Sequence, residues 1–364
     1  MHVGLIIYGG LDTLSGGYLY DRMLVEYLRA AGDTVDVVGL PVVSYGQALG
    51  QNFSRSIRSR LAVLQVDLLL QDELNHPSLF ALNRWLQQAV NAPFIGIVHH
   101  LRSSEPHNRL LRALYRAIER QYLESLDGYV FNSHSSRQAV NALALHQKPF
   151  AVATPGGDAL EEPTFGFQNG AHSQIIRSEC QLRGVEILFV GNLIERKGLH
   201  SLLAALARVR SESWHLRVVG RGDVEPAYTR SCRQLVSSAD LENQVEFLGA
   251  LNDGDLVHAY RTSQLLAVPS TFEGFGIVYL EAMRWGVVPI AGAAGGSEEI
   301  IQHGINGWLV PPGDKVVLAA VIETASRNPE ILQPMSQAAR QRYAEFPTWR
   351  QTTENIRQFM LTQL

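Results

Sequence analysis

Cysteine and lysine are scarce in this chain of 364 residues. Its two cysteines, Cys180 and Cys232, cannot build a disulfide framework or a four-thiolate zinc site, and such sparing use suits a reducing cytoplasm. Only Lys148, Lys197 and Lys315 are lysines, so the other 28 of the 31 basic residues are arginines. With 35 acidic residues the formal net charge is -4, which excludes a general nucleic-acid binder.

Several motifs that would indicate other protein classes are absent. The opening residues, MHVGLIIYGG, lack the basic leader and cleavage site of a signal peptide, and we interpret them as a buried strand. No apolar run approaches the roughly 18 residues of a spanning helix. There is no P-loop and no HExxH zinc motif, and GRGDVE at 220–225 lacks the third glycine of a dinucleotide-binding loop. We therefore expect neither an NAD enzyme nor a membrane-spanning protein.

Short apolar segments alternate with longer amphipathic ones along the whole chain, which predicts parallel sheets with helices on both faces. At about 100–200 residues per domain, the length also indicates two domains. The apolar segments form two series: VGLIIY 3–8, VDVVGL 35–40, VDLLL 66–70, PFIGIV 93–98, GYVFN 128–132 and AVATPGGD 151–158, then VEILFVGN 185–192, HLRVVG 215–220, VEFLG 245–249, LLAVPS 265–270, VVPIAG 287–292 and GWLV 307–310. The predicted fold class is α/β, with two tandem Rossmann-like doubly wound domains.

Residues 159–184 interrupt this alternation, because they are rich in Gly, Ser, Gln and Glu and lack periodicity. We interpret them as a crossing between domains at 1–165 and 175–345. The helical pattern at 347–364 is expected to pack back on the first domain. Since ligands of such folds bind outside the carboxyl ends of the strands, we expect the chemistry in a central cleft between the domains.

The segment PSTFEGFGIVYLEAM at 269–283 carries two glutamates around a glycine-rich turn. If a helix begins near Gly276, the amides of Gly276, Ile277 and Val278 lack acceptors within it and can cradle a phosphate. Glu281, one turn further, would accept hydrogen bonds from sugar hydroxyls. The alternative is that Glu273 caps the helix and Glu281 is a solvated surface residue.

The segment VGNLIERKG at 190–198 follows the first strand of the second domain directly. Arg196 and Lys197 stand there at the start of the next helix, where the helix dipole opposes cations. They can neutralise a diphosphate, Arg through its planar fork and Lys as a compact charge. The alternative is a solvated helix start.

These motifs occur in a fixed order, GNLIERKG, VVGRGD, FLGALNDGDLVHAY, PSTFEGFGIVYLEAM and NGWLVPPGD, over about 180–345. Together they resemble the donor half of the family 4 retaining glycosyltransferases, also called glycosyl transferases group 1, which have the GT-B architecture. That family carries two glutamates with seven residues between them, which Glu273 and Glu281 match. The resemblance implies a transferase that moves a hexose from a nucleoside-diphosphate sugar, such as a UDP-, GDP- or ADP-sugar, to a hydroxyl of a glycan, lipid or small molecule.

The resemblance also implies roles for individual residues. Lys197, Arg196, Glu273 and His99 would be catalytic, with His100 as the alternative histidine at that strand end. Glu273 would engage the donor sugar and Glu281 the ribose hydroxyls, while the leaving phosphate accepts the proton of the acceptor. The remaining residues predicted to bind the donor are Gly16 and Gly17 of the glycine loop in TLSGGYLYDRMLVEYL, Gly191, Asn192, Gly220, Phe275, Gly276, Ile277 and Val278. Because cations and helix dipoles can replace a divalent metal, we expect no metal or other cofactor.

One position departs from the family pattern. The family usually has Arg directly after the glycine of the first donor-domain strand, where this chain has Asn192, although Lys197 keeps its place. Arg196 is the candidate replacement for that charge. The departure motivates one alternative, a non-catalytic sugar-nucleotide-binding subunit. A second alternative is another enzyme of this architecture, a GT-B-like epimerase or phosphorylase.

The segment LRSSEPHNRLLRALYRAIERQY at 101–122 is rich in arginine, with leucines between the arginines at helical spacing. One interpretation is an amphipathic helix whose apolar stripe lies in the core and whose arginines are solvated. The other is peripheral contact with anionic lipid or a charged acceptor. We expect a cytoplasmic protein, either free or peripheral on the inner face of the membrane.

Overall fold

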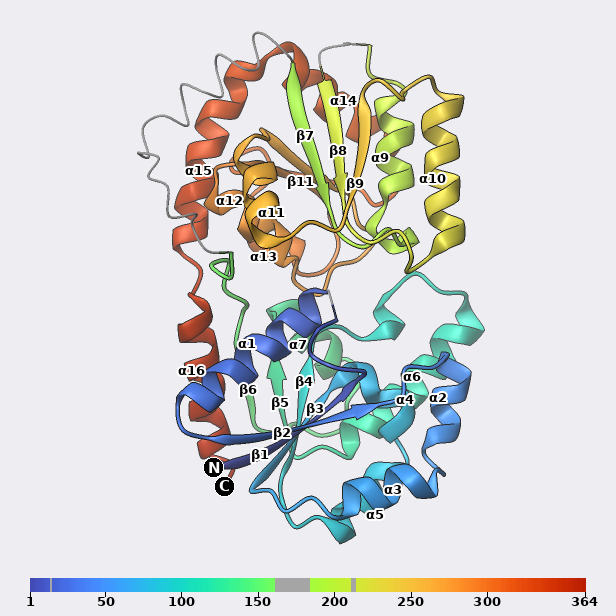
Figure 1. Ribbon diagram of the computed structural model, residues 1–364, viewed down its shortest axis with the longest axis vertical. Coiled ribbons are helices and arrows are strands. Elements are labelled where there is room, and N and C mark those ends of the chain that lie inside the picture. The colour runs from blue at the N-terminus through green and yellow to red at the C-terminus, as the bar shows by residue number, and fades with distance from the viewer. Residues whose placement is uncertain (14, 161–183, 211–213) are drawn as a thin grey trace. The chain divides into compact units, whose positions relative to one another are not determined.

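A computed structural model describes residues 1–13, 15–160, 184–210 and 214–364. The chain divides into two compact units (Figure 1). Unit 1 comprises Met1–Pro155 and Thr348–Leu364, and unit 2 comprises Gly156–Pro347. The first segment of unit 1 therefore ends ten residues before the predicted boundary at 165. The predicted crossing at 159–184 lies almost entirely outside the described residues, as does Cys180, whereas Cys232 is a buried free thiol.

Unit 1 contains a six-stranded parallel sheet in the order β2-β1-β3-β4-β5-β6. Its strands are β1 (His2–Tyr8), β2 (Thr34–Leu40), β3 (Leu68–Asp72), β4 (Phe94–Val98), β5 (Gly128–Phe131) and β6 (Phe150–Val152). The central strands β3, β4 and β5 are buried along their whole length, as expected for strands with helices on both faces. This sheet confirms the first predicted series of strands.

The helices of unit 1 form two groups that pack on its sheet. α1 (Gly16–Ala30) lies against α16 (Trp349–Leu361), which also contacts β6, so the end of the chain belongs to this unit (Figure 1). The other helices are α2 (Tyr45–Gln51), α3 (Arg55–Ala62), α4 (His76–Leu79), α5 (Leu82–Ala89), α6 (Arg109–Glu124) and α7 (His134–Asn141), with short 3-10 turns η1 (Glu73–Asn75) and η2 (Arg102–Ser104).

Unit 2 contains a second six-stranded parallel sheet, in the order β12-β11-β10-β7-β8-β9. Its strands are β7 (Val185–Val190), β8 (Trp214–Val219), β9 (Val245–Gly249), β10 (Leu265–Val268), β11 (Val288–Gly292) and β12 (Trp308–Val310). Its helical elements are η3 (Glu195–Lys197), α9 (Leu199–Leu206), α10 (Pro226–Ser238), α11 (Asp253–Arg261), α12 (Ile277–Arg284), α13 (Ser297–Ile300), α14 (Lys315–Arg327), η4 (Pro329–Ile331) and α15 (Leu332–Ala344). The α/β, Rossmann-like, doubly wound prediction is therefore confirmed for both units.

The arginine-rich segment differs from the prediction in its helix start and its buried face. The helix α6 begins at Arg109, and the residues before it form η2 and a loop. Ile118 and Tyr122 are buried, but Leu110 is 86% exposed and Leu114 is 47% exposed. Leu110 and Leu114 therefore lie outside the core, whereas Tyr115, Ile118 and Tyr122 lie in it.

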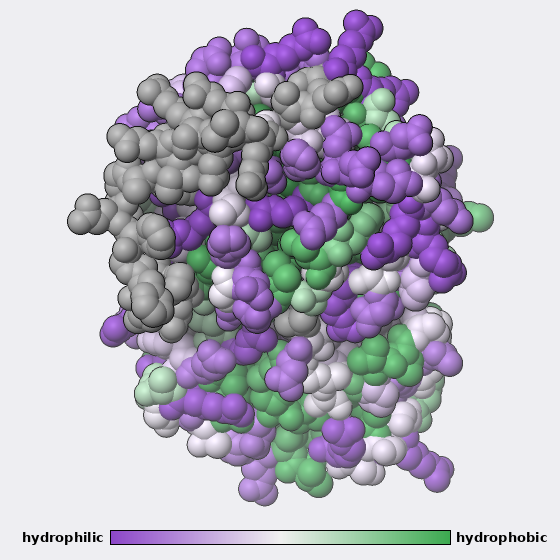
Figure 2. Space-filling model, turned by 45° about the horizontal axis from the view of Figure 1, so that its top comes forward, coloured by the Kyte–Doolittle hydropathy of each residue, from purple (hydrophilic) through white to green (hydrophobic). Residues whose placement is uncertain are grey.

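The surface is mixed in character. On the face shown in Figure 2, hydrophobic residues lie in groups between hydrophilic ones. Within residues 1–13, 15–160, 184–210 and 214–364, no helix combines the length and the hydropathy that a membrane crossing requires.

Candidate functional site

In unit 2, two loops at the carboxyl edge of the sheet bring the predicted cations to Glu273. The loop after β7 carries Lys197, and the loop after β10 carries Glu273. The Lys197 Nζ lies 2.6 Å from the Glu273 Oε1, and the Arg196 Nη1 lies 3.6 Å from Oε2. Ser270 Oγ donates a further hydrogen bond of 2.6 Å to Glu273 Oε1. One buried carboxylate thus holds two cations in place.

The two loops are also joined through their backbones. The amide of Thr271 donates to the carbonyl of Arg196 over 2.9 Å, and the Arg196 guanidinium donates to the carbonyl of Phe272 over 2.6 Å. Gly198 adopts φ +75°, and a Cβ there would lie 2.4 Å from the carbonyl oxygen of Pro269. These contacts fix Arg196 and Lys197 relative to Glu273 before any ligand arrives, which is the preorganisation that electrostatic catalysis needs.

The charges around Glu273 favour its ionised form. Burial by itself would raise its pKa, but Lys197 and Arg196 lower it from 4.5 to about 2. Burial lowers the pKa of Lys197, and the like charge of Arg196 adds to that effect against the attraction of Glu273. The cluster holds two cations against one carboxylate, so its summed side-chain charge favours an anion.

Two glycines allow the strand ends of β7 and β8 to approach closely. Gly220 adopts φ +147°, and a Cβ there would lie 1.9 Å from the carbonyl oxygen of Gly191. A Cβ on Gly191 would lie 3.5 Å from the Cε of Lys197, so the bare backbone of Gly191 borders the lysine stem. Asn192 follows Gly191 at the same strand end. The structure thus brings Gly191, Gly220 and Lys197 together.

The helix α12 begins where the glycine-rich turn predicts. Gly276 is the residue before the helix, with φ +100°, and a Cβ there would lie 2.5 Å from the ring of Tyr279. Helix geometry leaves the amides of Gly276, Ile277 and Val278 without acceptors inside the helix, and Gly276 at the N-cap position has no side chain to cap them. Phe275 packs edge-on against Phe346, with ring centroids 6.0 Å apart. This helix start can therefore receive an anion.

Both glutamates are buried, which contradicts the alternative of a solvated surface residue for Glu281, and the Glu273 carboxylate binds Lys197 and Ser270. Glu273 is 5% exposed and Glu281 is 6% exposed. The Tyr260 hydroxyl donates to Glu281 Oε2 over 2.8 Å. Burial raises the pKa of Glu281, which this hydrogen bond offsets in part. Glu281 is therefore an oriented hydrogen-bonding group.

In unit 1, the structure places His99 beside the glycine loop and separates it from His100. Gly16 and Gly17 are the first residues of α1, and a Cβ on Gly17 would lie 3.3 Å from His99 Cδ2. His99 is 6% exposed and packs edge-on against Tyr20, whereas His100 turns to Glu105, 3.0 Å from its Nε2. Of the two candidates, His99 is therefore the one next to the loop.

Sequence reasoning missed two buried acids beside His99. Asp72 ends β3, Asp21 lies on α1, and both are fully buried. Burial raises the pKa of Asp21 to about 7; burial, with the charge of Asp21, raises that of Asp72 to about 8. An acid at the end of a buried strand was the available signal for Asp72, whereas nothing in the sequence marked Asp21, because helices commonly carry acids.

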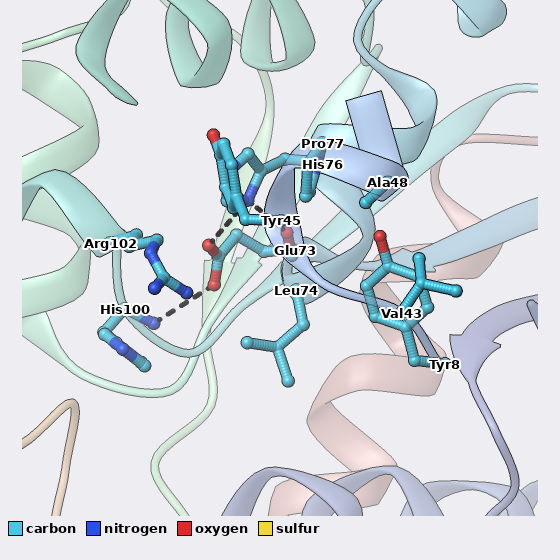
Figure 3. A pocket seen from close by; sticks show the side chains of 10 residues that line it. All are labelled: Tyr8, Val43, Tyr45, Ala48, Glu73, Leu74, His76, Pro77, His100 and Arg102. Carbon is cyan, nitrogen blue, oxygen red and sulfur yellow. Dashed lines mark hydrogen bonds and ion pairs between the residues drawn. The ribbon is translucent and has the colours of Figure 1, made fainter. Parts of the chain in front are cut away.

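A pocket of about 200 Å³ also lies in unit 1 (Figure 3). Its lining residues are Tyr8, Val43, Tyr45, Ala48, Glu73, Leu74, His76, Pro77, His100 and Arg102. Glu73 lies between His76 and the backbone of His100, and Arg102 lies over the ring of Tyr45 at 5.2 Å. Burial raises the pKa of Glu73 to about 7 and lowers that of His76 to about 4. The pocket thus offers polar groups of low net charge beside aromatic rings.

Comparison with known proteins identifies the family. Residues 178–342 match the model of the glycosyl transferases group 1. A phosphatidyl-myo-inositol mannosyltransferase of Mycobacterium leprae (strain TN) is 30% identical over 360 residues, covering 90% of this chain and 88% of the relative. The chain therefore belongs to the group 1 glycosyltransferases, and it is an enzyme of glycosyl transfer.

Solved structures support the same architecture. Sucrose-phosphate synthase from Thermosynechococcus elongatus matches with a TM-score of 0.83 at 22% identity, covering 99% of this chain and 98% of that one. Anabaena HepE, solved with UDP and glucose, matches with a TM-score of 0.78 at 19% identity over the full length of both chains. The GT-B architecture expected from the sequence is thus confirmed.

Proposed function

We propose that this glycosyltransferase is a retaining hexosyltransferase that uses a nucleoside-diphosphate sugar as its donor. The observation that carries the proposal is the cluster of Lys197, Arg196 and Glu273 in the same unit as the uncapped start of α12. Two cations and a set of unused amides suit a diphosphate. The HepE structures with UDP and UDP-glucose support a uridine nucleotide as the first donor to test.

In the proposed reaction, the bond between the anomeric carbon and the diphosphate oxygen breaks, and negative charge grows on that oxygen. Lys197, Arg196 and the amides of Gly276–Val278 stabilise the charge. The leaving phosphate accepts the proton of the acceptor hydroxyl, whose oxygen bonds to the anomeric carbon on the same face. This route needs no separate base, so Glu273 and Glu281 are not a glycosidase acid–nucleophile pair. Glu281 binds the ribose hydroxyls, and Glu273 engages the donor sugar while it orients Lys197.

We further propose that donor binding needs no divalent metal. The charge that a metal would neutralise at the diphosphate is met by Lys197 and Arg196. One Asp-x-Asp pair does occur in unit 2, at Asp253 and Asp255, but it lies in the first turn of α11. There the Asn252 side chain binds both the amide and the carboxylate of Asp255. Asn252 thus caps this helix, and the carboxylate of Asp255 is engaged by that cap.

For the acceptor, we propose that the pocket of unit 1 receives a hydroxyl-bearing ring of a glycan, lipid headgroup or small molecule. The Glu73 carboxyl and the His76 ring can exchange hydrogen bonds with hydroxyls, and the rings of Tyr8 and Tyr45 can pack on the apolar face of a sugar. The inositol lipid named for the Mycobacterium leprae relative supports such an acceptor.

We also propose a cytoplasmic location with peripheral contact at an anionic membrane, through the first half of α6. Arg109, Arg112 and Arg116 are exposed there beside Leu110 and Leu114. Exposed leucines between arginines suit an interfacial helix. In vesicle sedimentation, Leu110→Ser with Leu114→Ser should weaken binding to phosphatidylglycerol vesicles. Equal binding of the wild type to neutral phosphatidylcholine vesicles would contradict the proposal.

The central test combines the purified full chain with labelled UDP-, GDP- and ADP-sugars and mixed acceptors, with and without EDTA. We expect transfer from one nucleotide class, unchanged donor binding in EDTA, and a product that keeps the anomeric configuration of the donor by NMR. Donor binding without turnover over the whole acceptor panel would favour the non-catalytic subunit. Turnover without an acceptor, or only with inorganic phosphate, would favour the epimerase or phosphorylase.

A further inference from the structure

Three side chains with metal-binding atoms converge at the carboxyl edge of the sheet of unit 1. Asp21 projects from α1, Asp72 ends β3, and His99 follows β4 directly. Their ligand atoms all lie within 4.8 Å of one another. Asp21 and Asp72 are fully buried, and His99 is 6% exposed. Three elements far apart in the sequence thus bring one imidazole nitrogen and two carboxylates close together in a buried place.

The Asp21 and Asp72 carboxyls can hydrogen-bond to each other only if one of them is protonated; when both are ionised, most of the polar atoms at this point have no hydrogen-bond partner among the described residues. They are both carboxylate oxygens of Asp21, the Oδ2 of Asp72 and the Nε2 of His99. Buried polar atoms are normally paired, and buried charges are paired with other charges or bind metals. Since Asp21, Asp72 and His99 each bring one ligand atom to within 4.8 Å of the others, a group with several coordination positions would satisfy these atoms together.

The geometry and the charge both suit a cation. His99 Nε2 lies 3.7 Å from Asp21 Oδ1, which is too long for a hydrogen bond. Two ligands on one ion, each bonded at about 2.0–2.2 Å, lie about 3–3.8 Å apart at ordinary coordination angles. A divalent ion with two carboxylates and a neutral imidazole has no net charge, which makes burial tolerable. We propose that Asp21, Asp72 and His99 bind one divalent transition-metal ion, zinc or manganese.

The surroundings hold the ligands in place. The amide of Leu74 donates to Asp72 Oδ1 over 2.8 Å, which leaves Oδ2 as the oxygen without a hydrogen-bond partner. Tyr20 packs on the His99 ring at 5.3 Å between centroids, and Gly17 borders the same ring. In metal sites, contacts of this kind from the surrounding residues fix the orientation of the ligating side chains. The ion would join α1 to the ends of β3 and β4, and no step of glycosyl transfer is assigned to it.

A neighbouring cluster provides an internal contrast. Glu73, His76 and Glu119 are also buried, with ligand atoms within 4.8 Å of one another. However, His76 Nδ1 lies 3.0 Å from the carbonyl oxygen of Glu73, and its Nε2 lies 3.2 Å from the Tyr45 hydroxyl. Both ring nitrogens are thus engaged within the protein. This second cluster is a hydrogen-bonded network and serves as the control.

The test is metal binding to the full chain, measured after EDTA treatment and removal of the chelator. We expect isothermal titration with Zn²⁺ or Mn²⁺ to show one ion per chain, and the melting temperature to rise with ion concentration by mass action. Asp21→Asn, Asp72→Asn and His99→Gln should each weaken binding by more than the roughly 10–100-fold that loss of an outer contact costs. Glu119→Gln should leave binding unchanged.

Folding of the variants can be checked in EDTA, where circular dichroism should match that of the wild type. Removing one of two adjacent buried carboxylates should stabilise the metal-free protein, so the variants are expected to fold. If the wild type binds neither ion, and Asp72→Asn only raises the melting temperature, the two carboxyls share a proton and the proposal is wrong. An equal loss of affinity in Glu119→Gln would also overturn it. Because the readout is metal binding, it is independent of glycosyl transfer.

Discussion

Buried carboxylates at the carboxyl edges of the two sheets have opposite electrostatic surroundings. In unit 2, Glu273 lies between Lys197 and Arg196, and its pKa falls to about 2. In unit 1, Asp21 and Asp72 lie beside one another and His99, and within the described residues no lysine or arginine forms an ion pair with either. At the edge of unit 2, two cations therefore offset the charge of the buried carboxylate. At the edge of unit 1, no described lysine or arginine offsets the charge of the two acids.

Two similar folds can therefore carry different side chains, and so different chemistry, at the carboxyl edge of the sheet. Parallel strands bring the following loops to one edge in both units, so both edges collect polar side chains. The residues delivered there decide the chemistry. Two cations and a bare helix start suit a phosphorylated ligand, whereas paired acids with an imidazole suit a cation. Variants at the carboxyl edges of the two sheets test this comparison, and the largest effect is expected at the edge of unit 2.

Removing Lys197 should have the largest effect on activity. Because one preorganised donor to a developing negative charge is commonly worth about 10²–10³ in rate, Lys197→Ala should lower turnover by about that factor. Steady-state kinetics with saturating donor would measure it. Lys315→Ala, which removes a lysine from the start of α14 in the same unit, is the matched control. Wild-type turnover in Lys197→Ala would exclude its role in leaving-group stabilisation.

Glu281→Gln should weaken donor binding more than it lowers turnover. A hydrogen bond to a charged group is worth about 1.5–3 kcal/mol, so we expect about a tenfold or greater loss of donor affinity. Titration calorimetry with the nucleoside diphosphate would measure it. Tyr260→Phe, which removes the hydroxyl that holds Glu281, should give a smaller loss in the same direction. Unchanged affinity in both variants would make Glu281 a structural residue.

Arg196 should carry part of the charge that the family places at the position of Asn192. Its guanidinium is fixed beside Glu273 and Phe272, so Arg196→Ala should lower donor affinity by about tenfold. Adding Asn192→Arg to that variant should restore part of the loss. A donor affinity that Arg196→Ala leaves unchanged would show that Lys197 and the helix amides suffice.

Glu273 should make the protein sensitive to acid. Its pKa in the folded state is about 2 against 4.5 as the ordinary value, so ionised Glu273 stabilises the fold above pH 4.5. This stabilisation is lost as the pH falls from about 4.5 towards 2. Urea unfolding at pH 6 and pH 3 should show a smaller difference for Glu273→Gln than for the wild type. An identical pH dependence in both proteins would exclude this contribution.

Sequence patterns predicted the strands of both sheets, because short apolar runs between amphipathic segments are a local signal. They also marked Lys197, Glu273, Gly276 and Glu281 as site candidates, since these residues lie in compact motifs beside strand ends; their roles stay predictions. The same reasoning missed Asp21 and the pocket around Glu73, whose members come from separate elements. It also left open whether Leu110 and Leu114 lie in the core or at the surface, because a periodic pattern does not reveal where a neighbouring element stops covering a helix; both are exposed.

The amino-acid sequence alone determined that this protein is an α/β enzyme of the glycosyltransferase family, because periodicity and motif order are properties of the linear chain. Only the tertiary structure decided which charges meet. The contact of Lys197 with Glu273 spans 76 residues, and that of His99 with Asp21 joins a strand end to a helix. Whether a cation lies beside a buried acid depends on residues that folding brings together from distant parts of the chain, and the sequence around the acid does not show them.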